Sequence, residues 1–136
     1  MVMEQMVRRC PDAKIIGVGF IERAQLEFYL HATVEYSQIE GTRVPVVVWE
    51  ISKADEQRLD RYEGYPSYYI KQEVLVRMAD GSKIKGMIYL MNLIRTAPPS
   101  AGYYEGIADA YKALGFGSEI TTVLEPAYRR SLTRSA

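Results

Sequence analysis

Two long strand patterns joined by a tight turn constrain the fold more than any other feature of this chain. They run from Tyr68 to Met78 and from Lys83 to Met91, with Ala79-Asp80-Gly81-Ser82 between them. Asp-Gly between strand patterns is a strong hairpin signal, because Asp and Gly tolerate the left-handed backbone that such turns require. The sequence therefore predicts an antiparallel hairpin in the second half of the chain.

Three further strand patterns precede this hairpin. Lys14 to Leu30 is strand-like, Ala32 to Tyr36 is another β stretch, and Val44 to Ile51 is almost wholly apolar. Apolar residues on both faces indicate a buried strand, so we expect the third pattern, which includes Trp49, to lie centrally in the sheet. Pro45 cannot donate a ladder hydrogen bond, which puts the start of that strand at an edge or beyond the paired region.

Helical patterns accompany these strands. They cover Glu4 to Arg9, Lys53 to Tyr62, Gly102 to Leu114, and Glu119 to Ser131, the last interrupted by a proline. Several antiparallel strands with few helices predict an α+β fold, either a small mixed β-barrel or a curled sheet with surrounding helices. No linker or internal repeat breaks the pattern, so we expect all 136 residues to form a single domain.

Composition narrows the classes of function. Acidic and basic residues balance at 17 each, which gives no argument for nucleic acid or an anionic membrane as a partner. No apolar run approaches the roughly 18 residues that span a bilayer, and the polar start does not read as a signal peptide. Cys10 and His31 are the only residues of their types, so no disulfide or zinc set is predicted and both are expected to pack or face solvent. A reducing cytoplasm is the expected compartment.

Glu63 is the principal candidate for chemistry. Ser52 is a fitting N-cap for the helix from Lys53 to Tyr62, and Gly64 is expected to cap its C-terminus. Glu63 then lies at the negative end of the helix dipole, which together with burial is expected to raise the pKa of its carboxyl group. Such a carboxylate suits a general base working near pH 7. Taken alone, this local pattern fits a solvated residue at a helix end at least as well.

Tyrosine is unusually common, with 11 residues against three phenylalanines and one tryptophan. Several tyrosines fall close together in the sequence: Tyr62, Tyr65, Tyr68 and Tyr69, and then Tyr103 and Tyr104. A buried tyrosine hydroxyl needs a hydrogen-bond partner, so such a group is able to line a small polar pocket. Tyrosine is also an ordinary strand residue, which explains most of the 11.

Several short motifs follow one another in a specific order. They are Val47-Val48-Trp49-Glu50-Ile51, Leu59-Asp60-Arg61-Tyr62-Glu63-Gly64, Tyr68-Tyr69, Tyr89-Leu90-Met91, Ala97-Pro98-Pro99-Ser100 and Tyr103. Their order resembles the gamma-glutamylcyclotransferase family, also called AIG2-like, and Met6 to Gly19 looks like that family's first helix and second strand. The resemblance covers nearly the whole chain and implies a small barrel with a helical surround.

The resemblance implies a transferase or lyase that cyclises a gamma-glutamyl group to 5-oxoproline and releases an amine or amino acid, as in glutathione metabolism. The substrate's own alpha-amine attacks intramolecularly, so the protein needs no Ser or Cys nucleophile. One carboxylate takes a proton from the ammonium and returns it to the departing nitrogen. The resemblance assigns this acid/base role to Glu63 and places Tyr69 and Tyr103 against the substrate. Core or sheet packing is the alternative for both tyrosines.

The resemblance also implies that no metal and no cofactor takes part. The expected partner is a small-molecule gamma-glutamyl substrate, with no nucleic acid and no membrane, and a homodimer is left open. A non-catalytic small-molecule-binding or interaction domain on the same fold is the competing interpretation, because a fold alone does not secure chemistry.

The chain departs from the family at its start. Family members begin with a strand ending in Tyr-Gly-Ser-Asn, whose backbone N–H groups hold the gamma-glutamyl moiety and form much of the oxyanion site. This sequence contains no such motif and begins with Met1-Val2-Met3. We expect that N-terminal strand to be missing, through a start set too far downstream, a truncation or a true loss. Losing one oxyanion donor typically costs about a hundredfold or more in rate.

Overall fold

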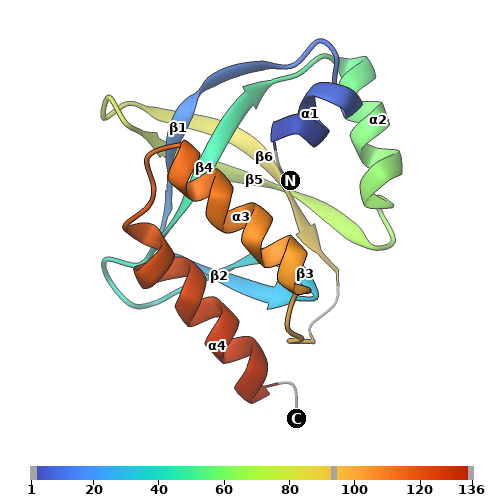
Figure 1. Cartoon of the computed structure of the whole chain (residues 1–136). Coiled ribbons are helices and arrows are strands. Elements are labelled where there is room, and N and C mark those ends of the chain that lie inside the picture. The colour runs from blue at the N-terminus through green and yellow to red at the C-terminus, as the bar shows by residue number, and fades with distance from the viewer. Residues whose placement is uncertain (1–2, 93–94, 135–136) are drawn as a thin grey trace.

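The computed structural model describes residues 3–92 and 95–134 (Figure 1). Its elements follow the order predicted from the sequence, with two corrections besides small differences at the ends. The stretch predicted as one strand from Lys14 to Leu30 divides at Arg23, which has a φ of 52°, into two strands of different sheets, and the predicted last helix divides into two segments. The elements are α1 (Met3–Arg9), β1 (Lys14–Glu22), β2 (Ala24–Tyr29), β3 (His31–Tyr36), β4 (Arg43–Glu50), α2 (Lys53–Glu63), β5 (Tyr69–Met78), β6 (Lys83–Met91), α3 (Ala101–Ala113), the π-helical segment η1 (Ile120–Leu124) and α4 (Glu125–Arg134). The chain is therefore an α+β protein.

Two curled antiparallel sheets form the framework. The larger has the strand order β4-β1-β5-β6 and the smaller pairs β2 with β3. The predicted hairpin joins β5 and β6, where the Met78 N–H donates to the Ser82 carbonyl at 2.8 Å and Gly81 has a φ of +89°. Within the described residues the strands do not close into a barrel, so the curled-sheet form of the prediction is the one confirmed.

The position of β4 corrects a prediction. Among the described residues it lies at an edge of the larger sheet and pairs with β1 alone, although its sequence is almost wholly apolar. Its two faces contact different hydrophobic clusters: Val46 and Val48 pack against the main core, whereas the half-buried Trp49 packs against Met6 and Leu59. A strand can therefore be apolar on both faces without being central, and Pro45 carried the correct signal.

The larger sheet is weakly joined at its middle. In the part of the chain that the structure describes, β1 pairs with β4 along nearly its whole length, but with β5 only at Gly19–Met78 and Phe20–Arg77, next to which the Ala79 N–H donates to the Val18 carbonyl at 3.2 Å. At this junction the backbones approach so closely that a Cβ on Gly19 would lie 2.4 Å from the carbonyl oxygen of Arg77. Glycine at this position is thus what allows the two strands to meet.

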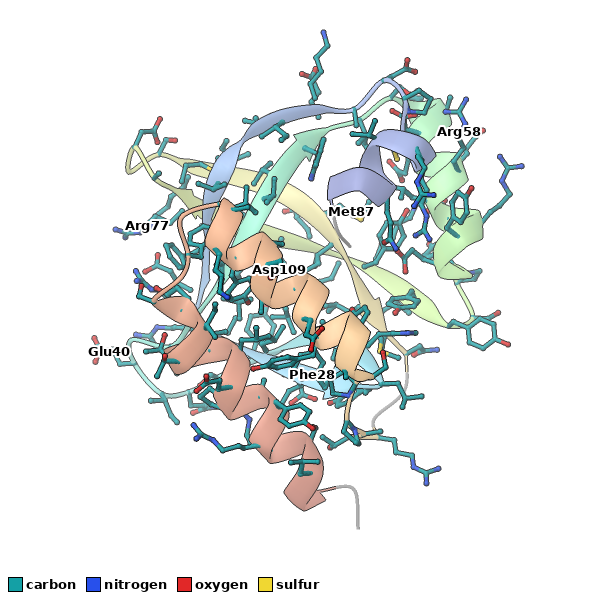
Figure 2. The ribbon with its side chains drawn as sticks, in the orientation of Figure 1. Phe28, Glu40, Arg58, Arg77, Met87 and Asp109 are labelled. Atoms are coloured by element: carbon teal, nitrogen blue, oxygen red, sulfur yellow. The ribbon has the colours of Figure 1, made fainter. Side chains whose placement is uncertain are left out.

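The main hydrophobic core brings together side chains of both sheets with those of α3, η1 and α4, and it includes Ile21, Val44 and Val76 of the larger sheet (Figure 1). Phe28, Leu124 and Ala127 have no exposed surface, and Figure 2 shows Phe28 among the side chains between β2, α3 and α4. A second, smaller cluster lies under α1 and α2 and contains Met6 and Cys10. Across the described ranges, no helix has both the length and the apolar character needed to cross a membrane.

Candidate active site

Helix α2 delivers Glu63 to the end of the larger sheet. Ser52 Oγ accepts a hydrogen bond from the Asp55 N–H at 3.1 Å, which caps the first turn as predicted. The helix ends at Glu63 because Gly64 adopts the left-handed conformation with a φ of 67° and its N–H bonds back to Arg61. Glu63 thus occupies the negative end of the helix dipole, as its sequence position predicted.

The surroundings of Glu63 favour its neutral form. Burial raises the pKa of this half-buried carboxyl group, and the positive charges of Arg9 and His31 oppose part of the rise. The direction agrees with the sequence prediction, although burial is the main cause. Within residues 3–92 and 95–134, Glu63 forms neither a hydrogen bond nor an ion pair with another side chain, so its oxygens face no competing partner.

Besides burial, the negative charge of Glu63 contributes to the raised pKa values of Tyr69 and Tyr103. Burial, with the negative charge of Glu63 and the neighbouring Tyr103, raises the pKa of Tyr69 to about 12. Burial also raises the pKa of Tyr103, whose hydroxyl oxygen accepts a 3.0 Å hydrogen bond from the Ala32 N–H. The His31 and Tyr103 ring centroids are 5.1 Å apart. The structure therefore gathers all three predicted site residues, from α2, β5 and α3.

The other tyrosines near the end of α2 do not join this group. Tyr62, Tyr65 and Tyr68 are 60%, 41% and 69% exposed. Tyr62 stacks under the guanidinium of Arg9 at 4.3 Å instead of turning inward. The idea that the whole run of tyrosines lines a pocket is therefore wrong, and Tyr69 is the member of it that faces Glu63.

Cys10 and His31 take the positions expected of residues that merely pack or face solvent. Cys10 is 1% exposed and its thiol points at the Asp55 carbonyl oxygen, 3.9 Å away. Burial raises the pKa of the Cys10 thiol, which makes it a poor nucleophile. His31 is exposed beside Tyr103. Among the residues that the structure describes, no group of three His, Cys, Asp or Glu side chains could hold a metal ion.

A polar network next to Glu63 was not predicted from the sequence. Lys71 on β5 donates to Glu56 at 2.6 Å and to Asp60 at 3.0 Å, and the Tyr89 hydroxyl on β6 donates to Asp60 at 2.5 Å. One signal pointed to it: Glu56 and Asp60 are four residues apart, hence on one helix face.

Two surface hollows lie away from these residues. One of about 560 Å³ is lined by β2, the turn before β4 and the segment around η1, with Arg43 and Glu119 in its wall. The other, of about 260 Å³, lies between β3 and the β5–β6 hairpin and is lined mainly by apolar side chains. Glu63 lines neither hollow.

A family model agrees with this geometry. Residues 6–107 match the family described as "Gamma-glutamyl cyclotransferase, AIG2-like". The chain belongs to this family. The match includes α2, β5 and the first half of α3, which supply Glu63, Tyr69 and Tyr103.

Individual relatives support the assignment. The chain is 36% identical over 83 residues to the human protein named gamma-glutamylcyclotransferase, a stretch covering 60% of this chain and 44% of that protein. A second relative, from Methanocaldococcus jannaschii, is 25% identical over 81 residues, which cover 57% of this chain and 65% of the relative. The matched stretch thus spans less than two thirds of either curated relative.

Two solved structures share the fold of this family member. A structure named gamma-glutamyl cyclotransferase is 28% identical with a TM-score of 0.79, and the match covers 91% of this chain and 80% of that one. The uncharacterized human protein loc79017 is 29% identical, with the same TM-score and the same coverage. The fold expected from the resemblance is therefore confirmed over nearly the whole chain.

Proposed function

We propose that this family member is a gamma-glutamylcyclotransferase that converts a gamma-glutamyl compound to 5-oxoproline and a free amine or amino acid. The observation that carries the proposal is Glu63 itself. It is a half-buried carboxylate with a raised pKa, held at a glycine-capped helix end beside Tyr69 and Tyr103. Raised carboxyl pKa values of this kind are characteristic of general acid/base sites.

The proposed reaction balances without an external nucleophile. Glu63 accepts a proton from the substrate's alpha-ammonium, and the free amine attacks the gamma-carbonyl carbon to form the ring C–N bond. Glu63 then returns this proton to the departing nitrogen as the original amide C–N bond breaks, and the second proton lost by the ring nitrogen passes to the same amine, which leaves as an ammonium. Holding the substrate in its folded conformation supplies the advantage of an intramolecular reaction, worth up to about 7–11 kcal/mol in well-oriented systems.

Tyr69 and Tyr103 act as neutral hydrogen-bond donors in this proposal. The pKa of Tyr69, raised to about 12, keeps its hydroxyl protonated at any physiological pH. Tyr103 accepts from the Ala32 N–H, which leaves its own hydroxyl proton to donate toward the substrate or Glu63. The two tyrosines therefore hold the substrate or orient Glu63, and do not exchange protons with it.

A panel of gamma-glutamyl compounds tests the proposal. Glutathione, a gamma-glutamyl amino acid and epsilon-(gamma-glutamyl)lysine are incubated with the 136-residue chain and with Glu63→Gln, and 5-oxoproline is quantified by mass spectrometry. We expect at least one compound to release 5-oxoproline with the parent chain and none with the variant. Equal release by both proteins, or release by neither, contradicts the proposal. We place the activity in a reducing cytoplasm, which suits a lone buried thiol.

A domain that binds gamma-glutamyl compounds without cleaving them is the second candidate, because a fold alone does not secure chemistry. Saturable binding of a non-cleavable gamma-glutamyl analogue, measured by calorimetry with no 5-oxoproline formed from any substrate, would support this binding function instead.

A further inference from the structure

A charged network fastens α2 to the sheet one turn before Glu63. The Lys71 ammonium bonds Glu56 and both oxygens of Asp60, and the Tyr89 hydroxyl donates to Asp60 Oδ1. The Lys71 and Asp60 side chains are only 21% and 26% exposed, unlike an ordinary surface pair. Bonds to charged groups in such partly shielded positions are shorter and stronger than neutral ones, so they fix the helix at this point.

The network shares a helix face with the proposed acid/base. Glu56, Asp60 and Glu63 are spaced by four and three residues, which places them along one side of α2. Lys71 engages the first two of these carboxylates. Tyr89 interacts with both Asp60 and Glu63. It donates a hydrogen bond to Asp60, and, besides burial and this bond, the negative charge of Glu63 contributes to its raised pKa.

We infer that Asp60, Lys71 and Tyr89 are positioning residues for Glu63: they hold the last turn of α2 on the sheet and keep the Lys71 ammonium away from the Glu63 carboxylate. The inference rests on the proposed function of Glu63. A lysine paired with Glu63 would occupy the oxygens that must take the substrate's proton. Glu56 and Asp60 hold that lysine one helical turn away, and the Tyr89 hydroxyl in turn bonds Asp60.

The charge states of the network suit this role. Burial alone would raise the pKa of Asp60, but hydrogen bonds from Tyr89 and Lys71 hold it below its usual range, so Asp60 stays a carboxylate. Hydrogen bonds to Glu56 and Asp60 raise the pKa of Lys71, so it stays an ammonium. Burial and the bond to Asp60 raise the pKa of Tyr89, so it stays a donor.

Other groups that act electrostatically on or with Glu63 lie outside the network and are kept when it is altered. They are Arg9 of α1, His31 of β3, Tyr69 of β5 and Tyr103 of α3. A change in the behaviour of Glu63 after substitution of Asp60 or Lys71 therefore reports on the network alone.

Two substitutions are expected to act in opposite directions. Asp60→Asn releases Lys71 toward Glu63, so the acidic limb of the pH–kcat/KM profile should move to lower pH. Lys71→Met removes the cation and leaves carboxylates beside Glu63, so the same limb should move to higher pH. Both should lower kcat more than they change KM, by up to about a hundredfold, as small misplacements of catalytic groups do. Lys71→Arg keeps the charge and should restore the parental limb.

A matched control and a second readout complete the test. Lys85→Met removes a lysine from the same hairpin, where Lys85 lies 3.9 Å from Glu73 with both side chains more than 70% exposed, and should leave the profile unchanged. Carbon-13 NMR titration of the Glu63 carboxyl group follows the same shifts without turnover. Unchanged titrations, or shifts in one common direction, overturn the inference. Activity that survives Glu63→Gln overturns the proposed function alone.

Discussion

Two buried or half-buried carboxylates, Glu27 under α4 and Glu63 at the end of α2, differ in whether a cation bonds them. Under α4, Glu27 has no exposed surface and pairs with Arg130 at 3.2 Å, while another nitrogen of Arg130 donates to the Leu26 carbonyl at 2.7 Å. At the end of α2, Glu63 is half-buried, and Arg9 and His31 influence it only through their charges. A buried carboxylate bonded to a cation holds elements together, whereas one without such a bond is available to a ligand.

The largest expected effect is a loss of catalytic activity on substitution of Glu63, which would distinguish its role from the structural role of Glu27. Glu63→Gln keeps the shape of the side chain and removes the base, so release of 5-oxoproline should fall by about 10²–10⁴-fold, the usual contribution of general acid/base catalysis. The urea midpoint of unfolding should stay close to that of the parent, because no bonded partner is lost. A large drop in that midpoint would place Glu63 with Glu27 as a structural residue.

The converse substitution addresses the α4 end. Arg130→Met deprives Glu27 of its bonded cation inside the core, and breaking a buried pair in this way typically costs about 3–5 kcal/mol of unfolding free energy. Activity per folded molecule should not change, since Arg130 is remote from Glu63. Urea denaturation monitored by circular dichroism measures the loss. A cost near zero would mean that Glu27 needs no cation and would remove the contrast.

A smaller effect on the free energy of unfolding is expected at Trp49, which packs against the small cluster under α1 and α2. Because Trp49 is half-buried on an edge strand, Trp49→Ala should cost about 1–3 kcal/mol, within the common range for single substitutions. Phe28→Ala, which empties a fully buried site, should cost about 3–5 kcal/mol. Equal losses in the two variants would show that the small cluster under α1 and α2 is as important to stability as the main core.

The smallest effect is a pH dependence of stability. The pKa of Glu63 is raised above its ordinary value of 4.5 in the folded protein, so the folded state binds more protons than the unfolded state in that window. The stability of the parent should therefore fall relative to Glu63→Gln as the pH rises from 4.5 through the raised pKa. Urea midpoints of both proteins across this range provide the comparison, and parallel curves would contradict the burial of Glu63.

Local signals predicted the elements well, and long-range pairing was less accessible. Asp80-Gly81 fixed the hairpin, and Ser52 and Gly64 fixed both ends of α2, because turns and caps depend on adjacent residues. The central placement of β4 was wrong because its apolar faces bury against separate clusters, which a sequence window cannot distinguish from two neighbouring strands. Closure of the sheet likewise depends on contacts between distant strands.

The candidate site shows the same difference between local signals, which the sequence reveals, and long-range contacts, which it does not. The helix-end position of Glu63 was legible in the sequence, and the family resemblance added Tyr69 and Tyr103, which the structure brings together with it. Neither the local sequence pattern nor the family resemblance predicted the roles of Lys71 and Tyr89, because these residues contact the carboxylates of α2 only when β5 and β6 pack against that helix. The exposure of Tyr62 was also out of reach, since it depends on Arg9 stacking over its ring from α1.

The narrow junction between β1 and β5 has a mechanical consequence. With pairing limited to Gly19 and Phe20, the larger sheet is two stiff ribbons sharing one short hinge, and their amide protons should exchange with solvent as two separate cooperative groups. The connection from the first ribbon to the second runs through α2. Because Lys71 and Tyr89 bond α2 to β5 and β6, flexing about this hinge moves the first ribbon relative to Glu63 and Tyr69 together and leaves the spacing between these two residues unchanged.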